Sequence, residues 1–134
     1  LLLCVSESGF AQQVEKTLVK SFNLEGSQEV LLDLKGQAEV QIWKSDILRV
    51  QMTITIENGS EAMLKSLVTA RRYNLQSKAD EVYKITAPGL EREIMLRGKP
   101  LAEKVSFVIY APEDVLIKFA NEASTQVEAK NSTL

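Results

Sequence analysis

The stretch LRVQMTITIE, residues 48–57, decides the fold class. Its apolar residues Leu48, Val50, Met52, Ile54 and Ile56 alternate with polar or charged ones. A period of two places the apolar side chains on one face of a β-strand and the polar side chains on the other. We therefore expect a long strand with one face in the core and the other in water.

Two shorter runs of the same period precede this strand, at Val30–Leu34 and Ala38–Ile42. Residues 35–37 contain a glycine between the two runs and predict a tight turn. We therefore expect three consecutive strands over residues 29–57, arranged as a meander or as successive rungs. An earlier strand is indicated upstream by Leu18, Phe22 and Leu24.

The period changes once, in residues 60–72. Ser60 is a suitable N-cap residue, and Glu61 follows in the first turn, where a negative charge suits the helix dipole. Leu64, Leu67 and Val68 recur at helical spacing. Together with the Arg71-Arg72 pair in its last turn, this segment predicts one amphipathic helix of suitable length to pack on a sheet.

Strand patterns resume after this helix. Tyr73 and Leu75 indicate the start of one strand, and short alternating runs follow up to Phe119. Val105–Tyr110 is apolar on both faces, as in a covered central strand. The expected fold is mainly β: an adhesin-like solenoid or sandwich of about eight to ten short strands with one amphipathic helix, about residues 60–72.

The amino-acid composition excludes several classes of function. The chain has 134 residues, a formal net charge of −2, one cysteine and no histidine. Such a balanced charge lacks the electrostatic footprint of a nucleic-acid-binding protein. Without histidine, the usual general base, the usual catalytic triads and most zinc sites are excluded. We therefore expect no enzyme activity, with no catalytic residue, no cofactor and no metal ligand.

Pairs of charged residues are interpreted as structural. Glu91 and Glu93 would share a strand face, and two further acidic pairs occupy expected turns. Glycoside hydrolysis needs two carboxylates on opposite sides of a sugar, so a carboxylate-dependent hydrolase is a remote alternative. Calcium binding is disfavoured because the chain has no Asp-x-Asp-x-Asp-Gly loop. The Arg71-Arg72 pair is better explained by a helix C-terminus than by phosphate or lipid binding.

Trp43 is the candidate contact residue. Strand alternation places it on the face opposite Val40 and Ile42. An outward indole would stack on a glycan ring or on a partner protein. The alternative is that Trp43 packs under the helix, around Leu64 and Val68.

The N-terminal end of the chain predicts export, and the C-terminal end predicts that the domain continues. Leu1–Val5 is apolar and small residues precede Gln12, so residues 1–11 are expected to be the remnant of a secretory signal peptide cleaved after Ala11. A lipoprotein signal with Cys4 as the lipid-carrying residue, or an ordinary apolar strand, is the alternative. Residues 12–134 would form a single β-rich domain that continues beyond the fragment, because Val127 and Ala129 indicate the start of another strand.

Two segments carry a family resemblance. DLKGQAEVQIW, residues 33–43, and VSFVIYAP, residues 105–112, resemble stretches of adhesin-like β-helix domains (auto-transporter adhesin head or GIN type) of the Bacteroidota cell envelope. The Phe10-Ala11-Gln12 junction resembles the signal cleavage site of these proteins. The resemblance implies a non-catalytic binding or structural domain and brings no catalytic residues.

The function we expect is therefore that of an exported, non-enzymatic domain located in the periplasm, at the outer membrane or on the cell surface. Its partner would be an envelope protein or a glycan, bound by a rigid strand surface or a strand edge. A periplasmic sensor or regulatory domain of a membrane-associated system is the alternative.

Overall fold

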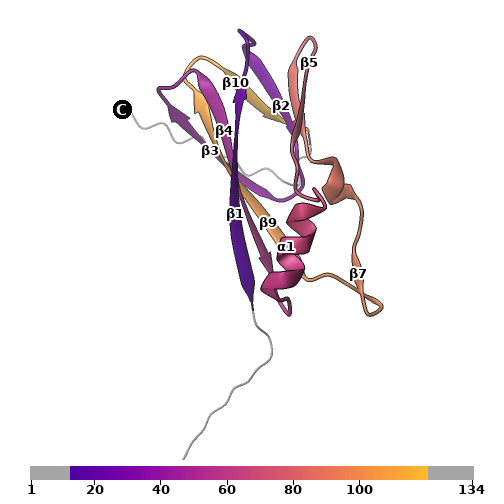
Figure 1. Ribbon diagram of the computed structural model, residues 1–134. Coiled ribbons are helices and arrows are strands. Elements are labelled where there is room, and N and C mark those ends of the chain that lie inside the picture. Colours follow the sequence, from indigo (N-terminus) through magenta and orange to yellow (C-terminus); the bar gives the residue numbers. More distant parts are fainter. Residues whose placement is uncertain (1–12, 121–134) are drawn as a thin grey trace, which may run out of the picture.

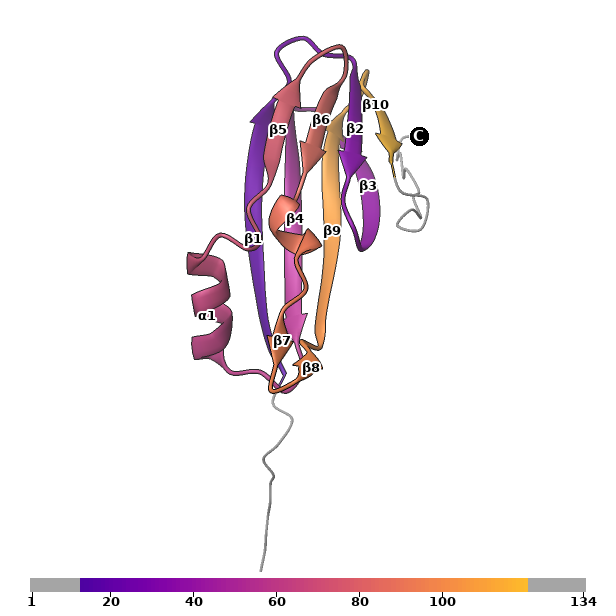
Figure 2. The same ribbon diagram turned by 90° about the vertical axis from the view of Figure 1, so that its right-hand side faces the viewer.

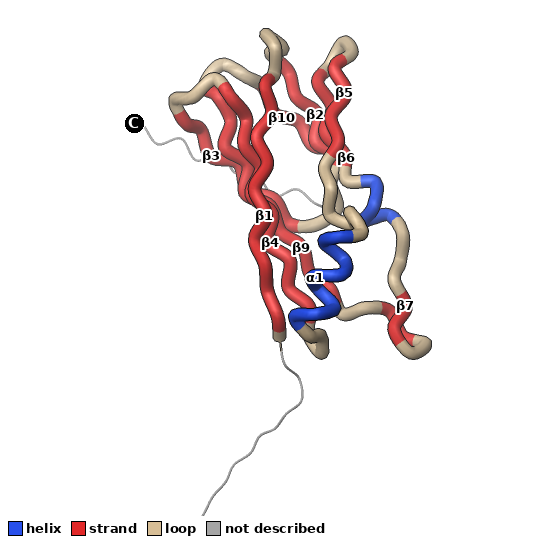
Figure 3. The backbone as a smooth tube through the Cα atoms, in the orientation of Figure 1, coloured by secondary structure: helices blue, strands red, loops and turns tan. Residues whose placement is uncertain are grey.

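The computed structural model describes residues 13–120 as ten β-strands, one α-helix and one 3-10 helix (Figure 1, Figure 3). Neither helix in this range is long and apolar enough to cross a membrane. In chain order the elements are β1 (Val14–Asn23), β2 (Glu29–Asp33), β3 (Gln37–Trp43), β4 (Ile47–Ile56), α1 (Glu61–Thr69), β5 (Gln76–Ala79), β6 (Tyr83–Thr86), η1 (Pro88–Glu91), β7 (Met95–Leu96), β8 (Lys99–Pro100), β9 (Glu103–Pro112) and β10 (Leu116–Phe119).

The strands form two layers (Figure 2). The first layer, called the long sheet, has the order β1-β4-β9-β3; the second, called the short sheet, has the order β10-β2-β6-β5. A small hairpin of β7 and β8 completes the strands. The short sheet faces the upper half of the long sheet, and α1 and η1 lie on the same side farther down (Figure 1).

The core lies between these layers as one hydrophobic cluster. Val50, Ile54 and Ile109 from the long sheet are fully buried, as are Val30 and Ile85 from the short sheet. The two layers also meet through an edge-to-face aromatic pair, Phe22 of β1 and Tyr83 of β6, with ring centroids 6.4 Å apart. One face of each sheet is thus apolar and buried, as the period of two predicts.

The order of strands in the long sheet corrects the meander and rung predictions. β9 lies between β3 and β4, parallel to β3 and antiparallel to β4, so the two consecutive strands do not pair with each other. β2 belongs to the other layer. β9 is central, as predicted, but it is not covered on both faces: Phe107 and Ile109 are buried, whereas Val108 and Tyr110 are partly exposed.

Gly36 is the point where the chain crosses from the short sheet to the long sheet, and not part of a hairpin turn. Its φ of +136° lies in a region that side chains disfavour. A Cβ at this position would lie 2.4 Å from the carbonyl oxygen of Val105. The crossover therefore requires glycine for two independent reasons.

The predicted helix forms, with an earlier end. Ser60 is the N-cap, and its hydroxyl accepts a hydrogen bond from the Met63 N–H. α1 ends at Thr69, followed by the C-cap Ala70, and Arg71 has a φ of +66°. The prediction that Arg71 and Arg72 occupy the last helical turn is therefore wrong. Leu64 is the buried residue of α1, which packs beside β1.

The mainly β prediction with one helix is confirmed for residues 13–120. The sheets in this range are open, and the strands do not form the stacked coils of a solenoid. Tyr73 and Leu75 are buried, but the strand expected to start with them begins later, at Gln76. The expected signal remnant at residues 1–11, the lipid-carrying Cys4 and the strand at residues 127–129 lie outside the described residues.

Candidate functional site

The outer face of the long sheet, turned away from the core, is the candidate binding surface. In each strand of this sheet, the residues that alternate with the core residues point to this face. No element of residues 13–120 covers it (Figure 1). Val19 of β1 is 56% exposed and Ile47 of β4 is 38% exposed. Exposed apolar side chains on an uncovered sheet face are a common feature of interaction surfaces.

Trp43 lies on this outer face, packed against Tyr110 and Arg49; we call these three residues the Trp43 cluster. The Trp43 and Tyr110 ring centroids are 5.3 Å apart with an interplanar angle of 37°. The Arg49 guanidinium lies over the indole, 4.9 Å from its centroid, in cation–π geometry. The register explains the grouping, because Tyr110 of β9 pairs with Arg49 of β4 on one side and with Gln41 of β3 on the other.

The polar atom of Trp43 is satisfied within the chain. Its indole Nε1 donates a hydrogen bond of 2.9 Å to the Ile47 carbonyl oxygen, across the turn between β3 and β4. The Ser45 hydroxyl accepts a hydrogen bond from the Ile47 N–H in the same turn. The indole is therefore held in one orientation, with its N–H already bonded within the chain.

This geometry places Trp43 opposite the buried Val40, as alternation predicts. The alternative position under the helix, around Leu64 and Val68, is wrong, because α1 lies on the other side of the long sheet (Figure 1). A glycan or partner contact at Trp43 stays a prediction. The flanking Gln41 and Glu39 side chains on β3, hydrogen-bonded to each other at 3.0 Å, add donors and acceptors beside the aromatic surface.

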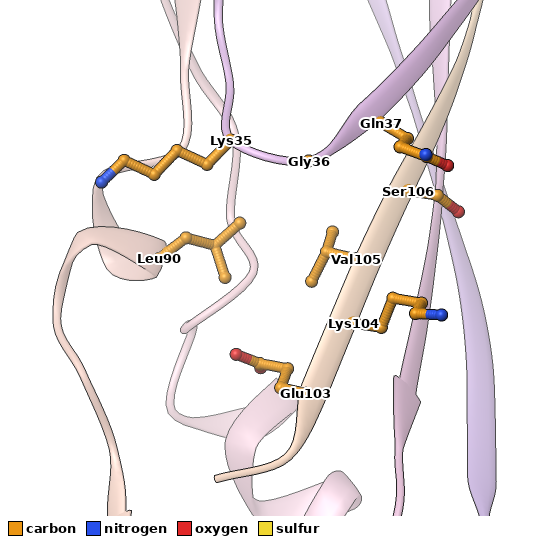
Figure 4. A pocket seen from close by; sticks show the side chains of 8 residues that line it. All are labelled: Lys35, Gly36, Gln37, Leu90, Glu103, Lys104, Val105 and Ser106. Carbon is orange, nitrogen blue, oxygen red and sulfur yellow. The ribbon is translucent and has the colours of Figure 1, made fainter. Parts of the chain in front are cut away.

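A second candidate is an open hollow of about 460 Å³ beside the lower part of β9. Figure 4 shows Leu90 and Val105 facing each other across it, with the Glu103 carboxylate at its lower end and Lys35 beside the crossover. Gln37, Lys104 and Ser106 point away, toward the outer face of the long sheet (Figure 4). Only Glu103 places a carboxylate here, and its oxygens are already engaged.

Glu103 belongs to a buried polar network with Arg72 and Tyr73. The Arg72 Nε and Nη2 donate to the two Glu103 oxygens at 3.0 and 2.7 Å, and the Tyr73 hydroxyl donates to Glu103 Oε2 at 2.6 Å. Arg72 Nη1 donates to the carbonyl oxygens of Gly89 and Arg92. The side chains of the ion pair are only 8% and 10% exposed.

The network keeps its members in fixed protonation states. Burial alone would raise the pKa of Glu103, but hydrogen bonds from Arg72 and Tyr73, together with the Arg72 charge, outweigh burial and lower it. Burial and the hydrogen bond to Glu103 raise the pKa of Tyr73, and the hydrogen bond to Glu103 raises that of Arg72 despite burial. These hydrogen bonds attach the segment after α1 to β9.

Sequence reasoning missed this network. It treated Arg72 as one of two basic residues at a helix end, whereas Arg72 is the buried member and Arg71 is exposed. The local signal was Tyr73 directly after Arg72, because an aromatic residue next to the arginine indicates that this segment turns toward the core. The partner Glu103 lies 31 residues away, and nothing in the local pattern identifies it.

The carboxylate pairs do not meet. Glu91 ends η1 and Glu93 follows it, so these two residues do not share a strand face as predicted. The other pairs lie at the turn between β5 and β6 and at the turn between β9 and β10: Asp80-Glu81 and Glu113-Asp114. In residues 13–120, no group of three or more acidic, cysteine or histidine side chains is placed to hold a metal ion.

Comparison with protein-family models, with curated proteins and with solved structures finds no match to this chain. The resemblance to adhesin-like β-helix domains therefore stays a prediction.

Proposed function

We propose that this chain is a non-catalytic, adhesin-like domain of a bacterial cell envelope and that it binds a glycan through the outer face of the long sheet. The observation that carries the proposal is the Trp43 cluster on an otherwise uncovered sheet face. Rigid aromatic side chains flanked by amide and carboxylate groups suit the apolar faces and hydroxyl groups of sugar rings. An envelope protein bound by the same face is the second candidate, which the exposed Val19 and Ile47 favour.

Two features support a binding role over catalysis. The acidic pairs lie at separate turns, which does not favour the remote alternative of a carboxylate-dependent hydrolase. The three groups with shifted pKa values, Arg72, Tyr73 and Glu103, hold one another and leave no proton acceptor directed at a substrate. A periplasmic sensor domain would use the same outer face, so the test below addresses binding first and location second.

The chain supplies its own probe for binding, because Trp43 is its single tryptophan. We expect the fluorescence of Trp43 to change on titration with one or more members of a panel of purified envelope oligosaccharides. Tyr110→Ala should weaken that binding at least about tenfold, in the range for an aromatic contact residue. Val19→Ala, on the same face but distant along the sheet, is the matched control and should bind as the parent does.

The proposal fails if no oligosaccharide changes the emission and Trp43→Ala leaves attachment to whole cells unchanged. If the domain instead binds an envelope protein, and Trp43→Ala abolishes that binding, the second candidate is supported. Location is tested by protease shaving of intact cells that express the full-length gene, with a periplasmic protein as control. Loss of the domain from intact cells supports the surface, and protection until the outer membrane is permeabilised supports the periplasmic sensor.

A further inference from the structure

Arg49 is the charged member of the Trp43 cluster, and its charge is not neutralised within the described chain. Its side chain is exposed, and its guanidinium lies 4.9 Å from the centroid of the Trp43 ring. Within residues 13–120 it takes part in no ion pair and no hydrogen bond. A guanidinium has five N–H donors and no acceptor. The donors of Arg49 are therefore free to bind oxygen atoms of a ligand.

The contact with Trp43 holds this charge in place before any ligand binds. A long basic side chain in water loses conformational entropy when a ligand orders it, which weakens binding. The cation–π contact places the Arg49 guanidinium over an indole whose own orientation is fixed by its hydrogen bond to the Ile47 carbonyl oxygen. Arg72, by contrast, donates to Glu103 and to two backbone carbonyl oxygens. Arg49 is thus positioned without being used by the fold.

The sheet register sets Arg49 in a row of polar side chains that crosses the whole outer face. Ser21 of β1 pairs with Arg49 of β4. Tyr110 of β9 pairs with Arg49 on one side and with Gln41 of β3 on the other. All four side chains are exposed or partly exposed. Neighbouring strands lie about 4.8 Å apart, so the row extends about 14 Å across the sheet, with hydroxyl and amide groups on both sides of the charge.

We propose that the glycan bound at the Trp43 cluster is acidic and that Arg49 binds the carboxylate of one of its uronic-acid units. This inference rests on the proposed function and names the class of sugar. A ligand that needed only aromatic surface would find the Trp43 ring partly covered by Arg49. A ligand with a negative group uses the residue that covers the ring, and hydroxyl groups of the same sugar reach Ser21, Gln41 and the Tyr110 hydroxyl along the row.

The charges around Arg49 favour a carboxylate over a phosphate. A planar guanidinium and a planar carboxylate form two parallel hydrogen bonds. Glu39 lies on the same face, one row along β3, and its Oε2 accepts a hydrogen bond from Gln41 at 3.0 Å. A phosphate monoester carries close to two negative charges at neutral pH and would be repelled more strongly by Glu39. A single negative charge suits the single cation of the cluster.

Calorimetric titration of the full chain with matched acidic and neutral sugars tests the charge. The probes are uronic-acid oligosaccharides prepared from polygalacturonate, alginate and hyaluronan, each compared with its carboxyl methyl ester. The ester keeps every ring and hydroxyl group but removes the negative charge. We expect at least one acid to bind at least about tenfold more tightly than its ester, in the range for a hydrogen bond to a charged group. A sulfated galactose oligosaccharide tests the shape of the anion and should bind more weakly than that acid.

Three substitutions test the assignment to Arg49. Arg49→Gln should weaken binding of the acid at least about tenfold and leave binding of the ester unchanged. Arg49→Lys keeps the charge but not the planar fork, and should restore only part of the affinity. Lys104→Gln is the matched control, because it removes the same charge from the same face, on β9 opposite Thr55, and should bind as the parent does. Urea denaturation should give all three variants the midpoint of the parent, since both side chains are exposed.

The outcomes separate this inference from the proposed function. Equal affinities for acids and esters, or acid binding that Arg49→Gln leaves unchanged, would overturn the acidic-glycan assignment while glycan binding itself stands. Neutral envelope oligosaccharides that bind more tightly than every acid would do the same. A sulfated sugar that binds as tightly as the best uronate would overturn the choice of a carboxylate. If no oligosaccharide binds, whether acidic or neutral, both the inference and the proposed function fail.

Discussion

Arg72 and Glu103 form a two-pronged ion pair that joins the segment after α1 to the first residue of β9. The two guanidinium–carboxylate hydrogen bonds measure 3.0 and 2.7 Å, and Glu103 also lines the open hollow beside β9. Four of the five Arg72 N–H groups donate to an acceptor in the chain, and two of these acceptors are the backbone carbonyl oxygens of Gly89 and Arg92. Arg72 therefore connects the segment after α1, Gly89 and Arg92 to the start of β9.

Removing one partner of this pair should cost far more than removing a surface pair. Glu103→Gln leaves a buried guanidinium without its counter-charge, and we expect a loss of about 3–5 kcal/mol in the free energy of unfolding. The control is Lys118→Ala, which breaks the exposed 3.3 Å pair with Glu29 and should cost about 0–1 kcal/mol. Urea denaturation of both variants measures the difference, and equal losses would contradict the assigned role of Glu103.

The lowered pKa of Glu103 predicts an acid dependence of stability. Because its folded-state pKa lies below the unfolded value of about 4.3, the stabilisation is complete above that value and is lost as the pH falls through the folded-state pKa. The parent should therefore lose stability more steeply below about pH 4 than Glu103→Gln does. Unfolding curves measured at several pH values give both slopes, and parallel slopes would refute the coupling.

Tyr73 predicts the opposite sign at high pH. Burial and the Glu103 carboxylate raise the pKa of Tyr73, so the unfolded chain releases the phenol proton first. Stability should be complete below the unfolded value of about 10 and fall as the pH rises above it. Tyr73→Phe removes this alkaline decline at the cost of one hydrogen bond at neutral pH. Tyr110→Phe serves as the comparison, and it should leave the alkaline decline in place.

Gly36 and Gly26 separate backbone strain from steric conflict. Both have positive φ, at +136° and +85°, but a Cβ at Gly26 meets nothing within 4 Å, whereas one at Gly36 meets the Val105 oxygen at 2.4 Å. Gly26→Ala should cost about 1 kcal/mol from backbone strain alone. Gly36→Ala should cost at least about 2 kcal/mol more, because β9 must shift. Thermal unfolding measures both, and equal costs would show that the crossover tolerates a side chain.

The local sequence pattern predicted where strands and the helix lie along the chain, but not which strands pair with each other. The period of two located β2 to β4, and Ser60 located the start of α1, because both signals depend on residues close in sequence. The end of α1 was placed too late, since the positive φ of Arg71 and the burial of Arg72 depend on contacts with η1 and β9. The order of strands in the sheets was not predicted, because it also depends on contacts between residues distant in sequence.

In the candidate site, too, the position of one residue was predictable from the sequence and its neighbours were not. Alternation placed Trp43 on the outer face, because the strand fixes the direction of its side chain. Its neighbours Tyr110 and Arg49 come from β9 and β4, and only the sheet register brings them together. The register of a parallel pair such as β3 and β9 is set by contacts distant in sequence, which no local pattern specifies.

The position of β9 between β3 and β4 has a consequence for how the chain acquires its fold. As synthesis delivers the chain from its N-terminus, β1 and β4 can pair with each other, but β3 has no partner until residues 103–112 arrive. The same strand completes the pairing of both β3 and β4, so formation of the long sheet depends on loops that close over roughly half of the described chain. Such high contact order slows folding, and a nascent chain that stops before β9 keeps apolar strands uncovered. We therefore expect the domain to fold in one step after β9 becomes available. A chaperone that covers residues 30–56 until then would prevent their aggregation.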